Sequence, residues 1–132
     1  MFEPKQYDVL IAGTGVAGLC CALNLPQSCR VLMLSKAAED ESDSFLAQGG
    51  ICMLQGEEDF AAYFEDTLRA GHYENDEAAV KLMIESSPAM IAELVRCGVD
   101  FARDAQGNFR LTREGGHSRP RILFHDDVTG KE

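Results

Sequence analysis

Two short apolar runs flank an amphipathic stretch near the start of the chain. The runs are Tyr7–Ala12 and Arg30–Ser35, and such continuous apolar character is typical of strands buried on both faces of a sheet. Between them, apolar residues recur at spacings of three and four, which predicts a short helix from Gly15 to Pro26. The order of strand, tight turn, helix and strand predicts a βαβ unit over about residues 6–36.

The middle of the chain has helical rather than strand periodicity. The acidic segment Ala37–Ser44 is typical of a solvated loop, and a short apolar run, Ile51–Leu54, follows it. An apolar stripe over Phe60–Ala70 predicts a helix that Gly71 ends. A second helix is expected from a cap at Asn75 or Asp76, with a break at Ser87-Pro88 and an end at Gly98. Residues 99–132 are expected to form short strands and turns.

Composition and charge narrow the classes of protein. The chain has 132 residues, is 45% hydrophobic and carries a net charge of −10, which argues against nucleic acid or an anionic membrane surface as a general partner. Its longest apolar runs are far shorter than the roughly 20 residues that a membrane span needs. The first residues, Met1–Gln6, lack the pattern of a secretory signal, so we expect a cytoplasmic protein without a membrane span.

The cysteines indicate neither disulfides nor a metal centre. There are five, at positions 20, 21, 29, 52 and 97, with no C-x-x-C spacing. We therefore expect reduced and mostly buried thiols, and we expect no metal site.

The turn after the first predicted strand carries the clearest chemical signal. Gly13-Thr14-Gly15-Val16-Ala17-Gly18 is a G-x-G-x-x-G motif, which allows a tight turn, close approach of backbone N–H groups to a pyrophosphate, and close packing of helix on strand. The motif lies between a predicted strand and a predicted helix, which is the context that supports it. We therefore predict a Rossmann-like, dinucleotide-binding α/β fold, with a glycine-rich turn of another α/β domain as the alternative.

The end of the second predicted strand departs from the usual dinucleotide pattern. An Asp or Glu commonly binds the ribose hydroxyls there, but this chain has Ser35 followed by Lys36. The hydroxyl of Ser35 can bind a ribose hydroxyl, and Lys36 can approach a phosphate. Both residues therefore remain candidates for cofactor binding.

Several further segments, taken in order, resemble one family. Asp43-Ser44-Phe45-Leu46-Ala47-Gln48-Gly49-Gly50 offers a hydroxyl, an amide and two glycines, and it precedes Asp66-Thr67-Leu68-x-Ala70-Gly71 and Thr112-Arg113-Glu114-Gly115-Gly116-His117. Together with the glycine turn and Ser35-Lys36, these segments resemble the L-aspartate oxidase family, which is grouped with the flavoprotein subunits of succinate dehydrogenase and fumarate reductase.

The resemblance implies a cofactor and a reaction. It implies that FAD is bound by residues 13–18, Ser35, Lys36 and residues 43–50. Asp43 stands where the respiratory flavoproteins carry the histidine that bonds to FAD, so the family pattern implies noncovalent FAD. The implied reaction is oxidation of L-aspartate to iminoaspartate for NAD biosynthesis, with oxygen or fumarate as electron acceptor and hand-over of the product to quinolinate synthase.

The resemblance also assigns substrate residues. Glu114 would orient the substrate and accept hydrogen bonds from the ammonium group that distinguishes aspartate from succinate. Thr112 and His117 would also belong to the substrate site, whereas the family's catalytic arginine is expected beyond this chain. An exposed turn residue is the plainer alternative for Glu114.

A basic stretch stands out in this acidic chain. Arg110, Arg113, Arg119 and Arg121 lie within twelve residues, which suits a dicarboxylate because guanidinium pairs with carboxylate in a bidentate fork. For any single one of Arg110, Arg119 and Arg121, a surface salt bridge is an alternative of at least the same weight.

We expect residues 1–132 to be an incomplete FAD-binding domain. Its parts would be the βαβ unit at about 6–36, a flavin loop at about 43–50, a helical segment at about 60–98 and a substrate loop at about 109–121. No long parallel strand with a crossover helix returns after Leu54. A fumarate reductase or succinate dehydrogenase flavoprotein, and a non-catalytic nucleotide-binding fragment, remain the alternatives.

Overall fold

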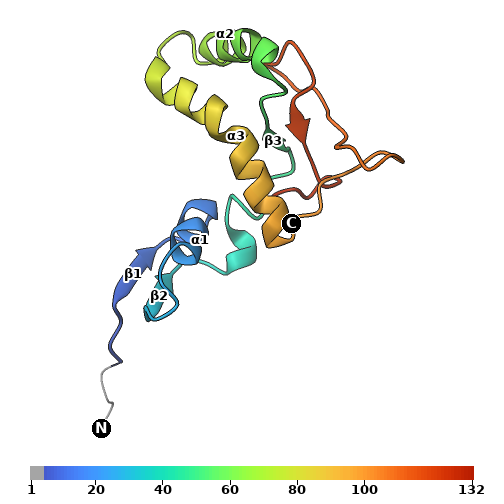
Figure 1. The fold of residues 1–132 in the computed structure, drawn as a ribbon. Coiled ribbons are helices and arrows are strands. Elements are labelled where there is room, and N and C mark those ends of the chain that lie inside the picture. Colours follow the sequence, from blue (N-terminus) through green and yellow to red (C-terminus); the bar gives the residue numbers. More distant parts are fainter. Residues whose placement is uncertain (1–4) are drawn as a thin grey trace. The chain divides into compact units, whose positions relative to one another are not determined.

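The computed structural model describes residues 5–132, which form two compact units. The first comprises the described residues up to Ala47, and the second is Gln48–Gly130. Together they contain parallel and antiparallel strand pairs and several helices (Figure 1). The predicted α/β class, with helices and short strands after a βαβ start, is confirmed.

The first unit is the predicted βαβ unit. Strand β1 (Val9–Ala12) leads through the glycine turn into helix α1 (Val16–Leu23), and strand β2 (Val31–Leu34) follows. The strands are parallel, with Val9 opposite Val31 and Ala12 opposite Leu34. The acidic segment that follows contains one short 3-10 helix, η1 (Glu39–Glu41). Because the strands are parallel, their carboxyl ends lie at one edge, where the glycine turn begins.

The thiols of the chain are free, but the expectation that most of them are buried is wrong. Cys20, Cys21 and Cys97 are exposed, while Cys29 and Cys52 are partly exposed. No residue of α1 is buried, and Leu23 at its end is 77% exposed. The sheet beside α1 has only two strands, which is too narrow to bury the apolar face of the helix.

The second unit is built from two helices and a short antiparallel strand pair. The 3-10 helix η2 (Glu57–Asp59) runs into α2 (Phe60–Ala70), which packs against α3 (Glu77–Cys97). Strand β3 (Ile51–Cys52) pairs with β4 (Ile122–Leu123). One core cluster contains Tyr63, Leu68, Val80 and Ile84, and a second contains Ile91, Phe101 and Leu123.

Helix α3 is continuous, so the predicted break at Ser87-Pro88 is wrong. Proline has no N–H to donate to the carbonyl of Ile84, four residues earlier. The hydroxyl of Ser87 donates to that carbonyl instead, at 2.7 Å. The same hydroxyl accepts from the backbone N–H of Leu54 at 2.9 Å, which ties α3 to the segment after β3. The ends agree with the sequence, because Asp76 caps the first turn and Gly98 ends the helix in the left-handed region.

In the part of the chain that the structure describes, no helix is both long enough and apolar enough to cross a membrane.

We predict that Ser87→Ala destabilises the second unit. The substitution leaves the carbonyl of Ile84 and the N–H of Leu54 without their partner, so the free energy of unfolding should fall by about 1–3 kcal/mol. Urea unfolding followed by circular dichroism measures the loss. Ser86→Ala is the matched control, because its hydroxyl binds only the carbonyl of Leu82. An equal loss in both variants would contradict this explanation of the unbroken helix.

Candidate functional site

The glycine turn brings helix α1 close to strand β1. Gly13 has a φ of +112°, which favours glycine, and its N–H donates to the carbonyl of Leu34 at 2.8 Å. A Cβ atom on Gly18 would lie 2.2 Å from the carbonyl oxygen of Gly13. No side chain fits there, so the third glycine of the motif permits the close packing of helix and strand.

Ser44 reaches the amino-terminal end of α1. Its hydroxyl accepts from the backbone N–H of Val16 at 3.0 Å, and a Cβ atom on Gly15 would lie 3.1 Å from the same oxygen. The first N–H groups of a helix have no partner within the helix, and they attract anions. The hydroxyl oxygen of Thr14 is buried and has no hydrogen-bond partner among the described residues. The structure thus brings together two separately predicted cofactor segments, residues 13–18 and Ser44.

The other cofactor candidates of the first unit lie at the same end of the strands or in the loop that follows. Ser35 and Lys36 follow β2 directly and are exposed. The hydroxyl of Ser35 accepts from the N–H of Ala37 at 3.4 Å. Asp43, Leu46 and Ala47 are exposed on the segment after η1, whereas Phe45 is partly buried.

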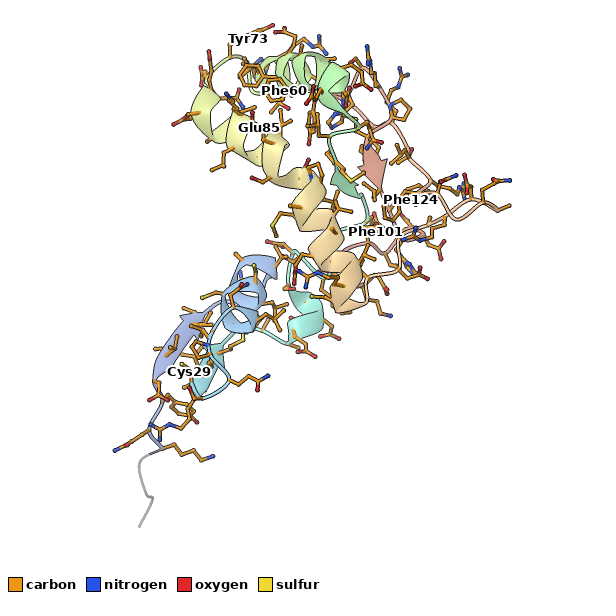
Figure 2. All side chains as sticks on the ribbon, in the orientation of Figure 1. Cys29, Phe60, Tyr73, Glu85, Phe101 and Phe124 are labelled. Atoms are coloured by element: carbon orange, nitrogen blue, oxygen red, sulfur yellow. The ribbon has the colours of Figure 1, made fainter. Side chains whose placement is uncertain are left out.

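A cavity of about 400 Å³ in the second unit joins candidate cofactor and substrate residues. Its walls include Gln48, Gly49, Thr112, Glu114, Phe124 and Asp127. Phe124, labelled in Figure 2, lies just after β4.

Three distances show how closely the segments around this cavity approach one another. A Cβ atom on Gly49 would lie 3.6 Å from a carboxylate oxygen of Glu114, and the amide of Gln48 donates to Asp127 at 3.4 Å. A Cβ atom on Gly50 would lie only 2.1 Å from the carbonyl of Leu123. Glycine at position 50 therefore lets the Gln48–Gly50 segment lie against β4.

His117 lies at a different cavity from Thr112 and Glu114. That cavity has a volume of about 500 Å³ and lies among α2, α3 and β3. The Nε2 atom of His117 is 3.3 Å from the sulfur of Cys52, and its ring makes an edge-on contact with Tyr63. Burial raises the pKa of the Cys52 thiol, which favours the protonated form. The structure therefore places the ring of His117 among packing contacts rather than at the cavity that Thr112 and Glu114 line.

Arg121 is completely buried. The sequence had instead indicated that it binds a dicarboxylate or forms a surface salt bridge. Its guanidinium donates to both oxygens of Asp59, at 2.7 and 2.8 Å, and to Asp66 at 2.8 Å. It also lies over the ring of Tyr63, 5.0 Å from the ring centre. The anions that bind this arginine belong to the chain itself, so Arg121 is neither a surface residue nor available to a ligand.

The charges of this cluster stabilise one another. Hydrogen bonds from Arg121 lower the pKa of Asp59. Burial alone would raise the pKa of Asp66, but hydrogen bonds from Ser118, Arg121 and Arg69 lower it well below its usual value. The spacing of Asp59, Tyr63 and Asp66 could have revealed the cluster, because positions i, i+4 and i+7 share one helical face. Two carboxylates on the face of a core tyrosine need a buried cation.

The other arginines of the basic stretch remain at the surface. Arg110 lies over the ring of Phe124, at 5.6 Å, and Arg119 is 3.9 Å from Asp59 with more than half of its side chain exposed. Arg113 is exposed. Among residues 5–132, no three His, Cys, Asp or Glu side chains are arranged to hold a metal ion.

The fold and the glycine turn define a dinucleotide-binding α/β protein. A family model described as an FAD binding domain matches residues 8–132. The chain therefore belongs to the FAD binding domain family.

Its similar proteins include L-aspartate oxidases. The chain is 45% identical over 124 residues to the L-aspartate oxidase of Clostridium perfringens and 41% identical over 138 residues to that of Pseudomonas aeruginosa. These alignments cover 94% and 98% of this chain but only 28% and 26% of the two relatives. The chain thus spans little more than a quarter of their length.

Solved flavoprotein structures have the same fold. The Sdh1 complex of Mycobacterium smegmatis matches with a TM-score of 0.84 and 29% identity, over 96% of this chain and 22% of that chain. An Escherichia coli quinol fumarate reductase variant matches with a TM-score of 0.84 and 27% identity, over the same shares of the two chains.

We predict that Arg121→Met destabilises the second unit strongly. The substitution leaves Asp59 and Asp66 buried without their cation, which should lower the free energy of unfolding by about 3–5 kcal/mol. Arg119→Met removes a largely exposed cation and should cost less than about 1 kcal/mol. Urea unfolding of both variants tests this, and comparable losses would show that burial of Arg121 is not decisive.

Proposed function

We propose that this chain is the cofactor-binding and substrate-facing part of an L-aspartate oxidase, which oxidises L-aspartate to iminoaspartate. One observation carries the proposal: Gln48 and Gly49, from the candidate flavin segment, line the same cavity as Thr112 and Glu114, from the candidate substrate segment. Such a cavity can hold a small dicarboxylate next to the part of the chain expected to contact the flavin. The similarity to L-aspartate oxidases over more than nine-tenths of the chain supports the same function.

The residues present fit FAD. The close approach at Gly18, the left-handed Gly13 and the unpartnered hydroxyl of Thr14 together form a turn suited to a pyrophosphate. Residues 13–18 would hold the pyrophosphate, Ser35 and Lys36 the ribose and its neighbouring phosphate, and residues 43–50 the flavin and its ribityl chain. When bound, FAD supplies the acceptor for the hydride that leaves the substrate carbon.

The mode of attachment would be noncovalent. By the family pattern, Asp43 occupies the position of the histidine that bonds to FAD in the respiratory flavoproteins. A carboxylate at this exposed position offers no imidazole nitrogen for such a bond. Denaturation should therefore release the flavin from the protein.

Glu114 is the residue that would select aspartate. Its carboxylate faces the Gly49 backbone at the cavity wall and can accept hydrogen bonds from a substrate ammonium. Succinate lacks this group, so it would leave the carboxylate without a partner. The hydroxyl of Thr112 would bind a substrate carboxylate, and His117, through its contacts with Cys52 and Arg121, would support the turn that follows Glu114. The principal catalytic arginine is expected outside these residues.

The proposed reaction implies a metabolic place. Iminoaspartate formation would be the first step of de novo NAD biosynthesis in the cytoplasm, with oxygen or fumarate accepting the electrons. Iminoaspartate is an unstable imine, which favours hand-over to quinolinate synthase.

A flavoprotein of the fumarate reductase or succinate dehydrogenase type is the second candidate. Solved structures of this type share the fold of the chain, with TM-scores of 0.84. The identities of 27–29% to those structures, against 41% and 45% to the two L-aspartate oxidases named above, favour the first candidate. A non-catalytic nucleotide-binding role would leave the Glu114 cavity without a use.

We predict that Glu114→Gln in the full-length flavoenzyme impairs aspartate oxidation selectively. Loss of the charged acceptor should lower kcat/KM for L-aspartate by about 10- to 100-fold, because it weakens a charge-assisted hydrogen bond. Fumarate reduction should change by less than about threefold, since fumarate has no ammonium group. Both rates are measured per bound flavin.

Glu85→Gln serves as the matched control. Glu85 lies on α3, is labelled in Figure 2 and pairs at the surface with Lys81, so this change should leave both rates as they are. Equal losses of the two activities in Glu114→Gln would exclude Glu114 as the ammonium selector.

A further inference from the structure

Three donors converge on one oxygen of Asp66. The Oδ2 atom accepts from the backbone N–H of Ser118 at 2.7 Å, from the hydroxyl of Ser118 at 2.6 Å and from Arg121 at 2.8 Å. The side chain of Asp66 is only 3% exposed, and its other oxygen accepts from Arg69. A buried carboxylate with this many short, charge-assisted bonds is held in one position.

Ser118 ends the turn that begins at Glu114. The N–H of His117 donates to the carbonyl of Glu114 at 3.2 Å, and Gly116 has a φ of +90°, so the chain reverses direction between these residues. One end of the turn therefore carries the Glu114 carboxylate at the cavity wall, and the other end is attached to α2 through Asp66.

The base of the same loop is fixed separately. The N–H of Thr112 donates to the carbonyl of Ile122 at 2.9 Å, and the N–H of Arg121 donates to the carbonyl of Thr112 at 3.2 Å. These bonds close the loop between residues 112 and 122 but do not reach its tip. Among the described side chains, Asp66 is the one that binds the backbone of the tip at Ser118.

We propose that Asp66 is a positioning residue for Glu114, which it holds at the cavity wall through the turn of residues 114–118. This inference rests on the proposed function, because its consequence is the recognition of the aspartate ammonium group. Asp66 does not line the cavity that contains Glu114. Its effect on Glu114 passes through Ser118, at the other end of the turn.

Asp59 provides a matched comparison. It binds Arg121 through two hydrogen bonds, but in the described part of the chain it makes no hydrogen bond with Ser118. If the two carboxylates serve only to neutralise Arg121, Asp59→Asn and Asp66→Asn should have similar effects. If Asp66 positions the turn, only Asp66→Asn should release it, because an amide oxygen carries no charge and would weaken the charge-assisted bonds that hold Ser118.

The experiment compares Asp66→Asn and Asp59→Asn in the FAD-loaded full-length enzyme by hydrogen exchange and steady-state kinetics. In Asp66→Asn, amides 114–118 should exchange about tenfold faster than in Asp59→Asn, whereas exchange in α2 and α3 should change to a similar degree in the two variants, because both weaken the ion cluster and only Asp66 binds Ser118. KM for L-aspartate should rise about tenfold with kcat changed less than about twofold, because ground-state binding of the ammonium is lost. In Asp59→Asn, KM for L-aspartate should stay within about threefold of wild type, because Ser118 keeps its bonds to Asp66.

Several outcomes would overturn the proposal. These are equal exchange of amides 114–118 in the two variants, unchanged exchange of these amides in Asp66→Asn, or faster exchange there with an unchanged KM. If Asp66→Asn does not fold, Ser118→Ala replaces it, since that change removes one bond to Asp66 and should still speed exchange of the turn about threefold.

Failure of the proposed function would look different. A wild-type enzyme that does not oxidise L-aspartate refutes the function whatever the variants do. The exchange of residues 114–118 then decides by itself whether Asp66 positions the turn.

Discussion

The second unit depends on the burial of one positive charge. Arg121 has no exposed surface, and a guanidinium in that position is tolerated only when carboxylates face it. Asp59 and Asp66 do so from η2 and α2, 62 and 55 residues earlier in the chain. Fixing Arg121 also fixes its neighbour Ile122 in β4, which pairs with β3 and with Thr112. This fixes the base of the loop that presents Glu114, while Asp66 binds the far end of its turn at Ser118. The buried ion cluster and the candidate substrate cavity are therefore parts of one arrangement.

The elements that could be predicted are those whose signals are local. The glycines, the apolar runs and the helical spacing around them specify the βαβ unit and its parallel strands within about 30 residues. Helix α3 shows where such signals fail. Pro88 predicts a break, but the hydroxyl of Ser87 supplies the hydrogen bond that proline lacks, and Leu54 donates to it from elsewhere in the unit. The exposed thiols of α1 illustrate the same limit, because an apolar stripe shows which face would be buried and not whether anything covers it.

Some parts of the candidate site could likewise be predicted from the sequence, and others could not. The contact of Ser44 with the start of α1, and that of Glu114 with Gly49, join segments which the family resemblance had selected separately. Their roles toward FAD and substrate stay predictions. The position of His117 could not be read from its motif, because the turn at Gly116 directs it toward Tyr63 and Cys52. Arg121 was missed because charge pairing across more than fifty residues leaves no periodic signal, and only the shared helical face of Asp59 and Asp66 hints at it.

The most direct test of the account is anaerobic reduction of the flavin in the full-length enzyme, followed by the loss of its visible absorbance. If Glu114 selects the ammonium group, L-aspartate should bleach the flavin fully, and succinate at the same concentration should leave it oxidised. Bleaching by succinate without bleaching by L-aspartate would contradict the account and assign the chain to the succinate dehydrogenase and fumarate reductase type.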